Sequence, residues 1–172
     1  FIDQIKKTGH KICSLIDIGT GSGCIPILIK KELPDAQVYA MDISEQALLI
    51  AAENAQVHQA DIQFVKADIR DSNLNLQTQF DYIISNPPYI LPEEKSDMHP
   101  RVYDQEPALA LFVTEHDPLE FYKAILNLAK THLKKDGAVY FEMNQQYGPA
   151  IQSLCVQYQF QCNILNDMYG NP

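Results

Sequence analysis

Short apolar runs alternate with amphipathic stretches along the chain, and this pattern predicts a regular succession of strands and helices. The apolar runs are rich in Ile, Val, Tyr and Phe and are bounded by polar or glycine-containing segments, which is typical of buried strands. They predict six strands, at residues 14–18, 37–41, 62–67, 80–85, 138–143 and 160–165.

The amphipathic stretches predict four helices, at residues 24–33, 45–57, 117–133 and 148–158. Ser44 is a favourable N-cap for the second of these helices. Asp117, Pro118 and Glu120 have the spacing of a capping box at the start of the third. The two lysines and the glycine of residues 134–137 are typical of a helix end, so we expect the third helix to stop there.

This alternation predicts an α/β fold, in which a parallel sheet is covered by helices on both faces. Right-handed crossovers then give a Rossmann-like, doubly wound and mostly parallel sheet, whose ligands bind at the carboxyl ends of the strands. The length of 172 residues suits one domain covering residues 1–172. Residues 87–116 are proline-rich and too long for an ordinary connection, which indicates a functional loop.

Composition narrows the classes of partner. With 13 Lys and Arg against 22 Asp and Glu, the net charge is −9. A strongly acidic domain is a poor electrostatic match for a phosphate backbone, so we do not expect this domain to bind nucleic acid. No apolar run reaches the roughly 18 residues of a transmembrane helix, so no membrane association is expected either.

The cysteines and histidines suggest no special chemistry. Because the cysteines form no C-x-x-C pair and no cluster with metal-ligand spacing, we expect free thiols, no metal site and a cytoplasmic location. These cysteines are Cys13, Cys24, Cys155 and Cys162. The histidines fall in predicted loops or at helix ends, and we expect surface positions for all five: His10, His58, His99, His116 and His132.

A glycine-rich loop joins the first predicted strand to the first helix, and we expect it to bind a cofactor. Glycine permits positive φ angles and a close approach of the backbone to a ligand. The helix that follows presents its N-terminal N–H groups to the same place. Asp42 ends the second strand, where a carboxylate can accept both hydroxyl groups of a ribose. The loop residues are Asp17, Gly19, Thr20, Gly21, Ser22 and Gly23.

Two cofactors compete for this loop. A dinucleotide favours G-x-G-x-x-G, whereas this loop has G-x-G-x-G, with Cys24 at the position of the third glycine. S-adenosylmethionine has no pyrophosphate but carries a sulfonium cation and an ammonium group. Asp17 and Asp68, each at the end of a predicted strand, are compatible with those cations. We therefore favour S-adenosylmethionine; the alternative without any cofactor is a tight glycine turn.

A second motif, Asn86-Pro87-Pro88-Tyr89, follows the fourth strand and opens the long loop. Two prolines stiffen the segment and remove two N–H donors. The Asn86 side-chain oxygen and the Pro87 carbonyl can each accept one N–H of a planar NH₂ group. Accepting these hydrogens raises the electron density on nitrogen as positive charge builds there. Tyr89 can pack on the flat face of the substrate. A rigid turn is the alternative.

These two motifs together resemble a known family. Residues 17–23 resemble motif I of class I S-adenosylmethionine-dependent methyltransferases, and residues 86–89 resemble the motif of those members that methylate planar nitrogens. Residues 85–90, the Glu-Pro-Ala-Leu-Ala-Leu-Phe stretch at 106–112, and Phe141-Glu142 with Gln145 or Gln146 are similar to the HemK/PrmC glutamine methyltransferases.

The resemblance implies methylation of the side-chain amide nitrogen of the glutamine in the Gly-Gly-Gln motif of peptide chain release factors. The glycine loop and Asp42 would then hold S-adenosylmethionine, which leaves as S-adenosylhomocysteine, and Ile69 would lie by the adenine. Asn86, Pro87, Pro88 and Tyr89 would hold the glutamine. A ribosomal-protein glutamine and an adenine or guanine amino group are the alternative substrates.

The chain departs from the family pattern at both ends. Only 16 residues precede Asp17, and the chain begins at Phe1 without a Met. Family members carry an N-terminal helical domain before motif I and end in an antiparallel strand. We therefore expect a catalytic domain alone, without the helical domain and the last strand.

Overall fold

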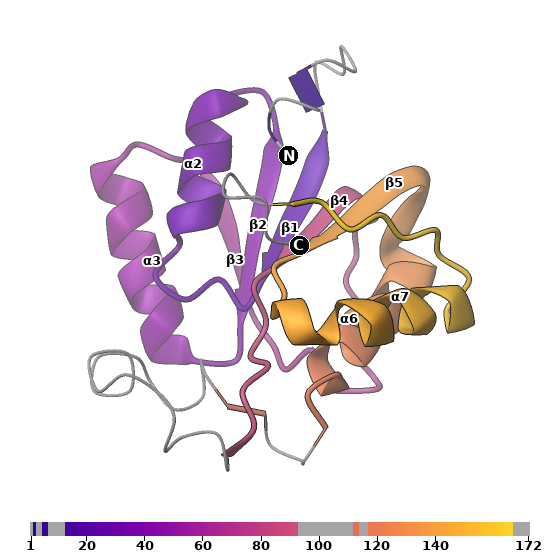
Figure 1. Ribbon diagram of the computed structural model, residues 1–172. Coiled ribbons are helices and arrows are strands. Elements are labelled where there is room, and N and C mark those ends of the chain that lie inside the picture. The colour runs from indigo at the N-terminus through magenta and orange to yellow at the C-terminus, as the bar shows by residue number, and fades with distance from the viewer. Residues whose placement is uncertain (1, 3–4, 7–12, 93–111, 114–116, 167–172) are drawn as a thin grey trace. The chain divides into compact units, whose positions relative to one another are not determined.

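The computed structural model describes residues 2, 5–6, 13–92, 112–113 and 117–166 (Figure 1). Its internal contacts divide the chain into two compact units. Unit 1 comprises Phe1–Asn86 and Leu128–Phe141, and unit 2 comprises Pro87–Asn127 and Glu142–Pro172.

Unit 1 is built on a five-stranded sheet in which all neighbouring strands are parallel. The strand order β3-β2-β1-β4-β5 changes direction at β1, as in doubly wound sheets. This confirms the predicted Rossmann-like α/β fold, and no antiparallel strand occurs among the described residues. The strands are β1 (Ser14–Ile18), β2 (Gln37–Asp42), β3 (Ile62–Lys66), β4 (Phe80–Ser85) and β5 (Leu133–Phe141).

Two helices pack on the sheet within unit 1, α2 (Cys24–Glu32) and α3 (Glu45–Val57), and Figure 1 shows them side by side. The Ser44 hydroxyl accepts a hydrogen bond from the N–H of Ala47 at 3.2 Å, which confirms the predicted N-cap of α3. The other helical elements are α6 (Glu120–His132), η2 (Gln145–Tyr147) and α7 (Gly148–Gln157). Of these, η2 and α7 lie in unit 2, and α6 continues from unit 2 into unit 1.

The central strand β1 is buried along its whole length, as expected for a parallel strand covered on both faces. Its Leu15 lies in a core with apolar residues of β2, β4 and α2. The buried members of this core are Ile5, Cys13, Leu15, Ile29, Ala36, Val38, Tyr82 and Ile84. All four cysteines are free, as predicted.

The predicted start of β5 is wrong. The strand begins at Leu133, directly after α6, whereas the lysines and glycine of residues 134–137 indicated a helix end. A Cβ atom on Gly137 would lie 2.8 Å from the carbonyl oxygen of Asp81, so glycine allows the close approach of β5 to β4. The register shifts there, from the pair Phe80–Leu133 to the pair Tyr82–Ala138.

The predicted strand at 160–165 is also wrong. Phe160, Cys162 and Ile164 are partly buried and alternate with exposed residues, but no described strand pairs with this segment. An apolar alternation forms a strand only where a neighbour offers a hydrogen-bonding edge, and the sequence does not show whether one exists.

His132 is buried, contrary to the prediction that all five histidines are surface residues. Its Nε2 accepts a hydrogen bond from the N–H of Leu76 at 3.0 Å, which ties the end of α6 to the segment before β4. His58 is exposed, as predicted, and the other three histidines lie outside the described residues.

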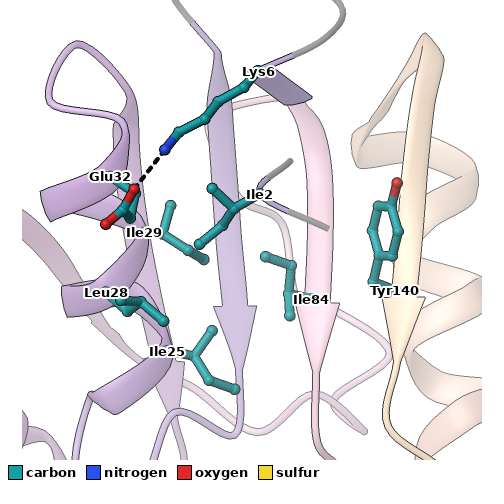
Figure 2. Close-up of a pocket in the computed structure, with 8 residues that line it drawn as sticks. All are labelled: Ile2, Lys6, Ile25, Leu28, Ile29, Glu32, Ile84 and Tyr140. Carbon is teal, nitrogen blue, oxygen red and sulfur yellow. Dashed lines mark hydrogen bonds and ion pairs between the residues drawn. The ribbon is translucent and has the colours of Figure 1, made fainter. Parts of the chain in front are cut away.

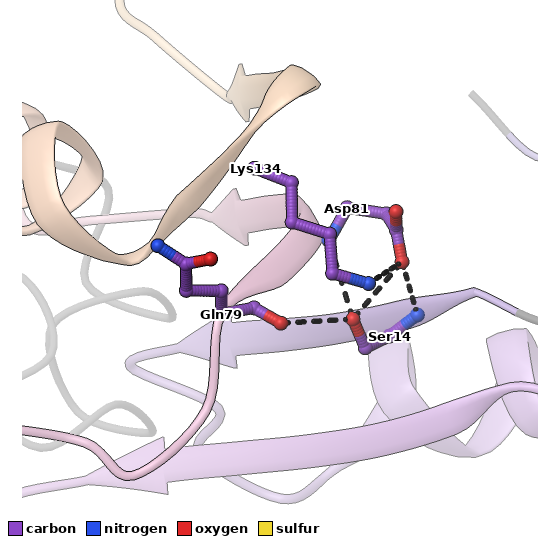
Figure 3. A network of polar contacts seen from close by, with 4 residues as sticks. All are labelled: Ser14, Gln79, Asp81 and Lys134. Carbon is purple, nitrogen blue, oxygen red and sulfur yellow. Dashed lines mark hydrogen bonds and ion pairs between the residues drawn. The ribbon is translucent and has the colours of Figure 1, made fainter.

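A polar network joins residues at the N-terminal ends of three strands (Figure 3). Asp81 Oδ2 accepts hydrogen bonds from the Ser14 N–H at 2.7 Å, the Ser14 hydroxyl at 3.0 Å and Lys134 Nζ at 2.8 Å. Burial acts to raise the pKa of Asp81, but Lys134 and Ser14 outweigh it and hold this pKa below its ordinary value. The network therefore fixes the starting registers of β1, β4 and β5.

We expect Asp81→Ala to lower the free energy of unfolding by about 1–3 kcal/mol, because the partly buried N–H of Ser14 loses its acceptor. Urea unfolding measures this change. Glu45→Ala is the matched control, since it removes a carboxylate from an exposed ion pair with Lys66 and should cost clearly less stability. Equal losses in the two variants would contradict a structural role for the network.

Candidate active site

The glycine loop connects the carboxyl end of β1 to α2 and is anchored to the end of β2. The N–H groups of Gly19 and Thr20 both donate to the Met41 carbonyl oxygen, at 2.8 and 3.0 Å. Gly19, Gly21 and Gly23 have φ angles of 74°, 55° and 81°, which residues other than glycine rarely adopt. The backbone conformation at these three positions therefore favours glycine.

The three glycines serve two different purposes. A Cβ atom on Gly23 would lie 3.0 Å from the Cβ of Ala51, so this glycine lets α2 and α3 approach each other. A Cβ atom on Gly19 or Gly21 would meet no atom within 4 Å. The backbone at these two positions is therefore open to a ligand.

Asp42 closes this loop from the end of β2. Its Oδ2 accepts the N–H of Gly21 at 2.9 Å, and its Oδ1 accepts the N–H of Ser44 at 2.9 Å. Each carboxylate oxygen has a second lone pair, so both oxygens can accept a further hydrogen bond. Asp42 therefore keeps acceptor positions for two hydroxyl groups, and its role in binding a ribose stays a prediction.

Asp17 is the buried carboxyl group of the site, with 1% of its surface exposed. Its Oδ2 makes no hydrogen bond with any described residue. Burial raises the pKa of Asp17 to about 7, the Asp42 carboxylate adds to this increase, and Thr20 partly offsets it. A buried acid without a partner is costly, and a cationic ligand group would relieve that cost.

Asp68, after β3, differs from Asp17 because its charge is already compensated. Arg70 donates to both carboxylate oxygens, from Nε at 3.0 Å and from a terminal nitrogen at 2.9 Å. This pairing holds the pKa of Asp68 below its ordinary value. The structure therefore adds Arg70 to the site, a residue that sequence reasoning missed; Ile69, between the two, is partly buried.

Asn86 lies next to the glycine loop in the strand order, because β4 is the neighbour of β1. Ile18, the last residue of β1, pairs with Ser85, the last residue of β4. The Ser85 hydroxyl donates to the Ile18 carbonyl oxygen at 2.7 Å in a buried position. The exposed Asn86 follows directly, and its side chain makes no hydrogen bond with a described residue.

Residues 87–89, the rest of the Asn-Pro-Pro-Tyr tetrapeptide, are assigned to unit 2. Pro87 is buried, Pro88 and Tyr89 are partly buried, and every described peptide bond is trans. Ile90 forms a β-bridge with Phe112, and its carbonyl oxygen accepts the N–H of Val113 at 3.0 Å. The segment that carries Tyr89 is therefore held on its C-terminal side.

Tyr89 has a partner that sequence reasoning did not assign. Its hydroxyl interacts electrostatically with the Glu142 carboxylate. Burial raises the pKa of Tyr89, and Glu142 adds to the increase. The sequence contained Glu142 as part of the family resemblance but gave no signal for this contact, since 52 residues separate the pair.

A cavity of about 530 Å³ lies elsewhere in unit 1 (Figure 2). It lies beside α2, β4 and β5, and its lining includes Ile25, Leu28 and Ile84, with the Lys6–Glu32 ion pair at 2.5 Å among the few polar groups. No predicted site residue lines it. Its lining is mainly apolar, and the carboxylate of Glu32 within it is already paired with Lys6.

The described residues contain no group of three or more His, Cys, Asp or Glu side chains arranged to hold a metal ion. Within the same part of the chain, no helix has the length and apolar character needed to span a bilayer.

The family model for the methyltransferase small domain matches residues 1–103, which include the glycine loop, Asp42, Asp68 and the tetrapeptide. The chain belongs to the methyltransferase small domain family. The matched range includes four of the five strands of unit 1, β1 to β4.

Curated relatives extend the similarity over almost the whole chain. A release factor glutamine methyltransferase of Flavobacterium psychrophilum is 42% identical over 170 residues, 98% of this chain and 59% of the relative. One from Bacteroides thetaiotaomicron is 42% identical over 170 residues, 98% of this chain and 61% of the relative. The chain therefore spans about three-fifths of the length of these relatives.

The fold of this methyltransferase small domain matches that of solved structures. A methyltransferase from Pyrococcus furiosus superposes with a TM-score of 0.67 at 18% identity, over 98% of this chain and 76% of that protein. Identity at this level reports on the fold alone.

We expect the free energy of unfolding to fall as the pH rises from 5 to 8, because unfolding lets Asp17 ionise at its ordinary pKa near 3.8 rather than about 7. The native state binds the extra proton in this window, so the penalty develops as pH increases. Asp17→Asn removes it and should make the ligand-free chain more stable than wild type at pH 8, by up to about 4 kcal/mol.

Urea unfolding at pH 5 and pH 8 measures this difference for wild type and Asp17→Asn. Asp68, with its lowered pKa, provides the comparison, because its contribution is complete above pH 5 and Asp68→Asn should leave the slope between pH 5 and 8 unchanged. The same loss of stability in all three chains would show that Asp17 is not the source.

Proposed function

We propose that this chain transfers a methyl group from S-adenosylmethionine to the side-chain amide nitrogen of the glutamine in the Gly-Gly-Gln motif of peptide chain release factors. The names and 42% identity of the Flavobacterium and Bacteroides relatives support this choice of substrate. S-adenosylhomocysteine is the expected product. The chain covers only 59% and 61% of those relatives, so the proposal concerns the domain that carries the two motifs.

One observation carries the proposal: the Ser85 hydroxyl joins the end of β4 to the end of β1. The glycine loop starts immediately after Ile18, and Asn86 starts immediately after Ser85. The two sequence motifs that indicate a cofactor and an amide substrate therefore begin one strand apart, at the same edge of the sheet.

The residues of the loop fit S-adenosylmethionine. Asp17 offers an unpaired buried oxygen to a cation, Asp42 has lone pairs for two ribose hydroxyls, and Gly19 and Gly21 leave space above the backbone. When bound, S-adenosylmethionine supplies an electrophilic methyl group on sulfur. The chain itself needs no nucleophile, because the substrate nitrogen displaces the sulfur directly.

The chain must make a poor nucleophile reactive. The lone pair of a carboxamide nitrogen is delocalised, and two acceptors on its N–H groups raise the electron density on nitrogen as positive charge develops. We assign these acceptors to the Asn86 side-chain oxygen and the Pro87 carbonyl. Holding the nitrogen in line with the methyl group also removes an entropic barrier, for which well-oriented systems gain up to about 7–11 kcal/mol.

A protein substrate agrees with the charge of the chain. The net charge of −9 disfavours the phosphate backbone that an adenine or guanine methyltransferase must bind. It is compatible with a protein partner that presents one glutamine on a flexible loop.

We expect Asn86→Ala to reduce methyl transfer at least about a hundredfold, the loss typical of removing one transition-state hydrogen-bonding group. Binding of S-adenosylhomocysteine, measured by calorimetry, should stay within about threefold of wild type, because the loop and Asp42 are unchanged. Asn75→Ala, at an exposed asparagine before β4, is the control and should leave both quantities unchanged.

The assay follows labelled methyl groups from S-adenosylmethionine into a release factor, ribosomal protein and duplex DNA. Transfer to the release factor, lost when its motif glutamine is replaced, supports the proposal. Transfer to ribosomal protein or DNA instead would overturn the substrate assignment, and full activity of Asn86→Ala would overturn the role of Asn86.

A further inference from the structure

Helix α3 contacts the glycine loop through two residues of one face. Ala51 and Asn54 are three residues apart on this helix, so their side chains are neighbours on its surface. Ala51 is fully buried, and a Cβ atom on Gly23 would lie 3.0 Å from the Cβ of Ala51. The Asn54 side chain donates a hydrogen bond from Nδ2 to the Ser22 carbonyl oxygen at 2.9 Å. This face of α3 therefore meets the last two residues of the loop.

The hydrogen bond from Asn54 orients the peptide unit between Ser22 and Gly23. The described peptide bonds are trans, and in a trans peptide the carbonyl oxygen and the following N–H point in opposite directions. With the Ser22 oxygen directed at α3, the Gly23 N–H points back into the loop and donates to the Thr20 carbonyl oxygen at 3.0 Å. This second bond closes a four-residue turn with Gly21 and Ser22 at its centre.

The loop is thus anchored from two elements. The end of β2 holds its first half, where the Met41 carbonyl oxygen accepts the Gly19 N–H and the Asp42 carboxylate accepts the Gly21 N–H. The Ser22 carbonyl oxygen has its partner on α3 instead. Gly21, whose backbone is open to a ligand, lies between these two anchors, so its conformation depends on both.

We propose that Asn54 is a positioning residue for cofactor binding: it holds the Ser22 carbonyl oxygen and so keeps the turn at Gly21 in the conformation that receives S-adenosylmethionine. This inference rests on the proposed function, because it takes the glycine loop as the cofactor site. Asn54 acts through the backbone of the loop. A loop that is ordered in advance binds its ligand more tightly, because the cost of ordering it does not fall on the binding step.

The first test is calorimetric binding of S-adenosylhomocysteine to variants of the full chain. Asn54→Ala should raise the Kd about three- to tenfold, the loss expected for one hydrogen bond of ordinary strength. Asn54→Asp keeps the shape of the side chain but has no N–H donor, so it should raise the Kd at least as much. Gln56→Ala, which removes an exposed amide from the same helix, is the matched control and should leave the Kd unchanged.

Alanine is a better helix former than asparagine, so Asn54→Ala does not weaken α3 itself. A Kd for Asn54→Ala equal to that of wild type, or an equal rise in Gln56→Ala, would overturn the inference.

Steady-state methyl transfer to the release factor separates positioning from general damage. In Asn54→Ala the KM for S-adenosylmethionine should rise, whereas kcat at saturating cofactor and the KM for the release factor should stay within about threefold of wild type. A variant that is merely less folded has fewer active molecules, so its kcat falls and its KM does not change. That second pattern would overturn the inference.

Amide hydrogen exchange, followed by ¹H–¹⁵N NMR on the ligand-free chain, tests the contact without any cofactor. The Gly23 N–H should exchange at least about threefold faster in Asn54→Ala, because the peptide that carries it is no longer held. The Gly19 N–H, whose acceptor is on β2, should exchange at its wild-type rate. Equal exchange of Gly23 in the two chains would overturn the inference.

The outcomes for the two proposals differ. A wild-type chain that binds no S-adenosylhomocysteine overturns the proposed function, whatever the exchange rates show. A wild-type chain that binds it, with Asn54→Ala binding equally well, overturns only the role of Asn54.

Discussion

The parallel pairing of β1 with β4 is the constraint on which the rest of the site depends. Its start is fixed where Asp81 accepts both donors of Ser14, and its end is fixed where Ser85 donates to the Ile18 carbonyl oxygen. With both ends of the pair set, a slip in register would break a partly buried hydrogen bond at one end and a buried one at the other. The glycine loop and Asn86 consequently leave the sheet side by side.

The same edge of the sheet contains the least stable electrostatic arrangement described in unit 1. Asp17 is buried, unpaired at Oδ2 and shifted to a pKa of about 7, whereas Asp68 and Asp81 are compensated by Arg70 and Lys134. Stability alone would favour a partner for Asp17 as well. Perturbed acids of this kind cluster at functional sites, where a ligand provides the missing partner. The ligand that we propose carries two cationic groups, so folding and cofactor binding are coupled through this carboxyl group.

The sequence predicted those features that local rules determine. The observed bounds of α3, β1 and β4 are those predicted. The three glycines of the loop have positive φ angles, as expected for glycine in a tight loop. It failed where contacts with a distant segment of the chain determine the local structure. Gly137 serves a close approach to β4 rather than a helix end, His132 is buried against Leu76, and Glu142 meets Tyr89 across 52 intervening residues. Such contacts depend on strand order and register, which periodicity along one chain does not encode.

The most direct test of this account is a crystal structure of the chain with S-adenosylhomocysteine and a peptide containing Gly-Gly-Gln. The account predicts that the ligand's ammonium group meets Asp17, its ribose meets Asp42, and the glutamine nitrogen points at the sulfur while Asn86 accepts one of its hydrogens. Adenosine bound in the apolar cavity beside Ile25, or a glutamine side chain directed away from the sulfur, would contradict it.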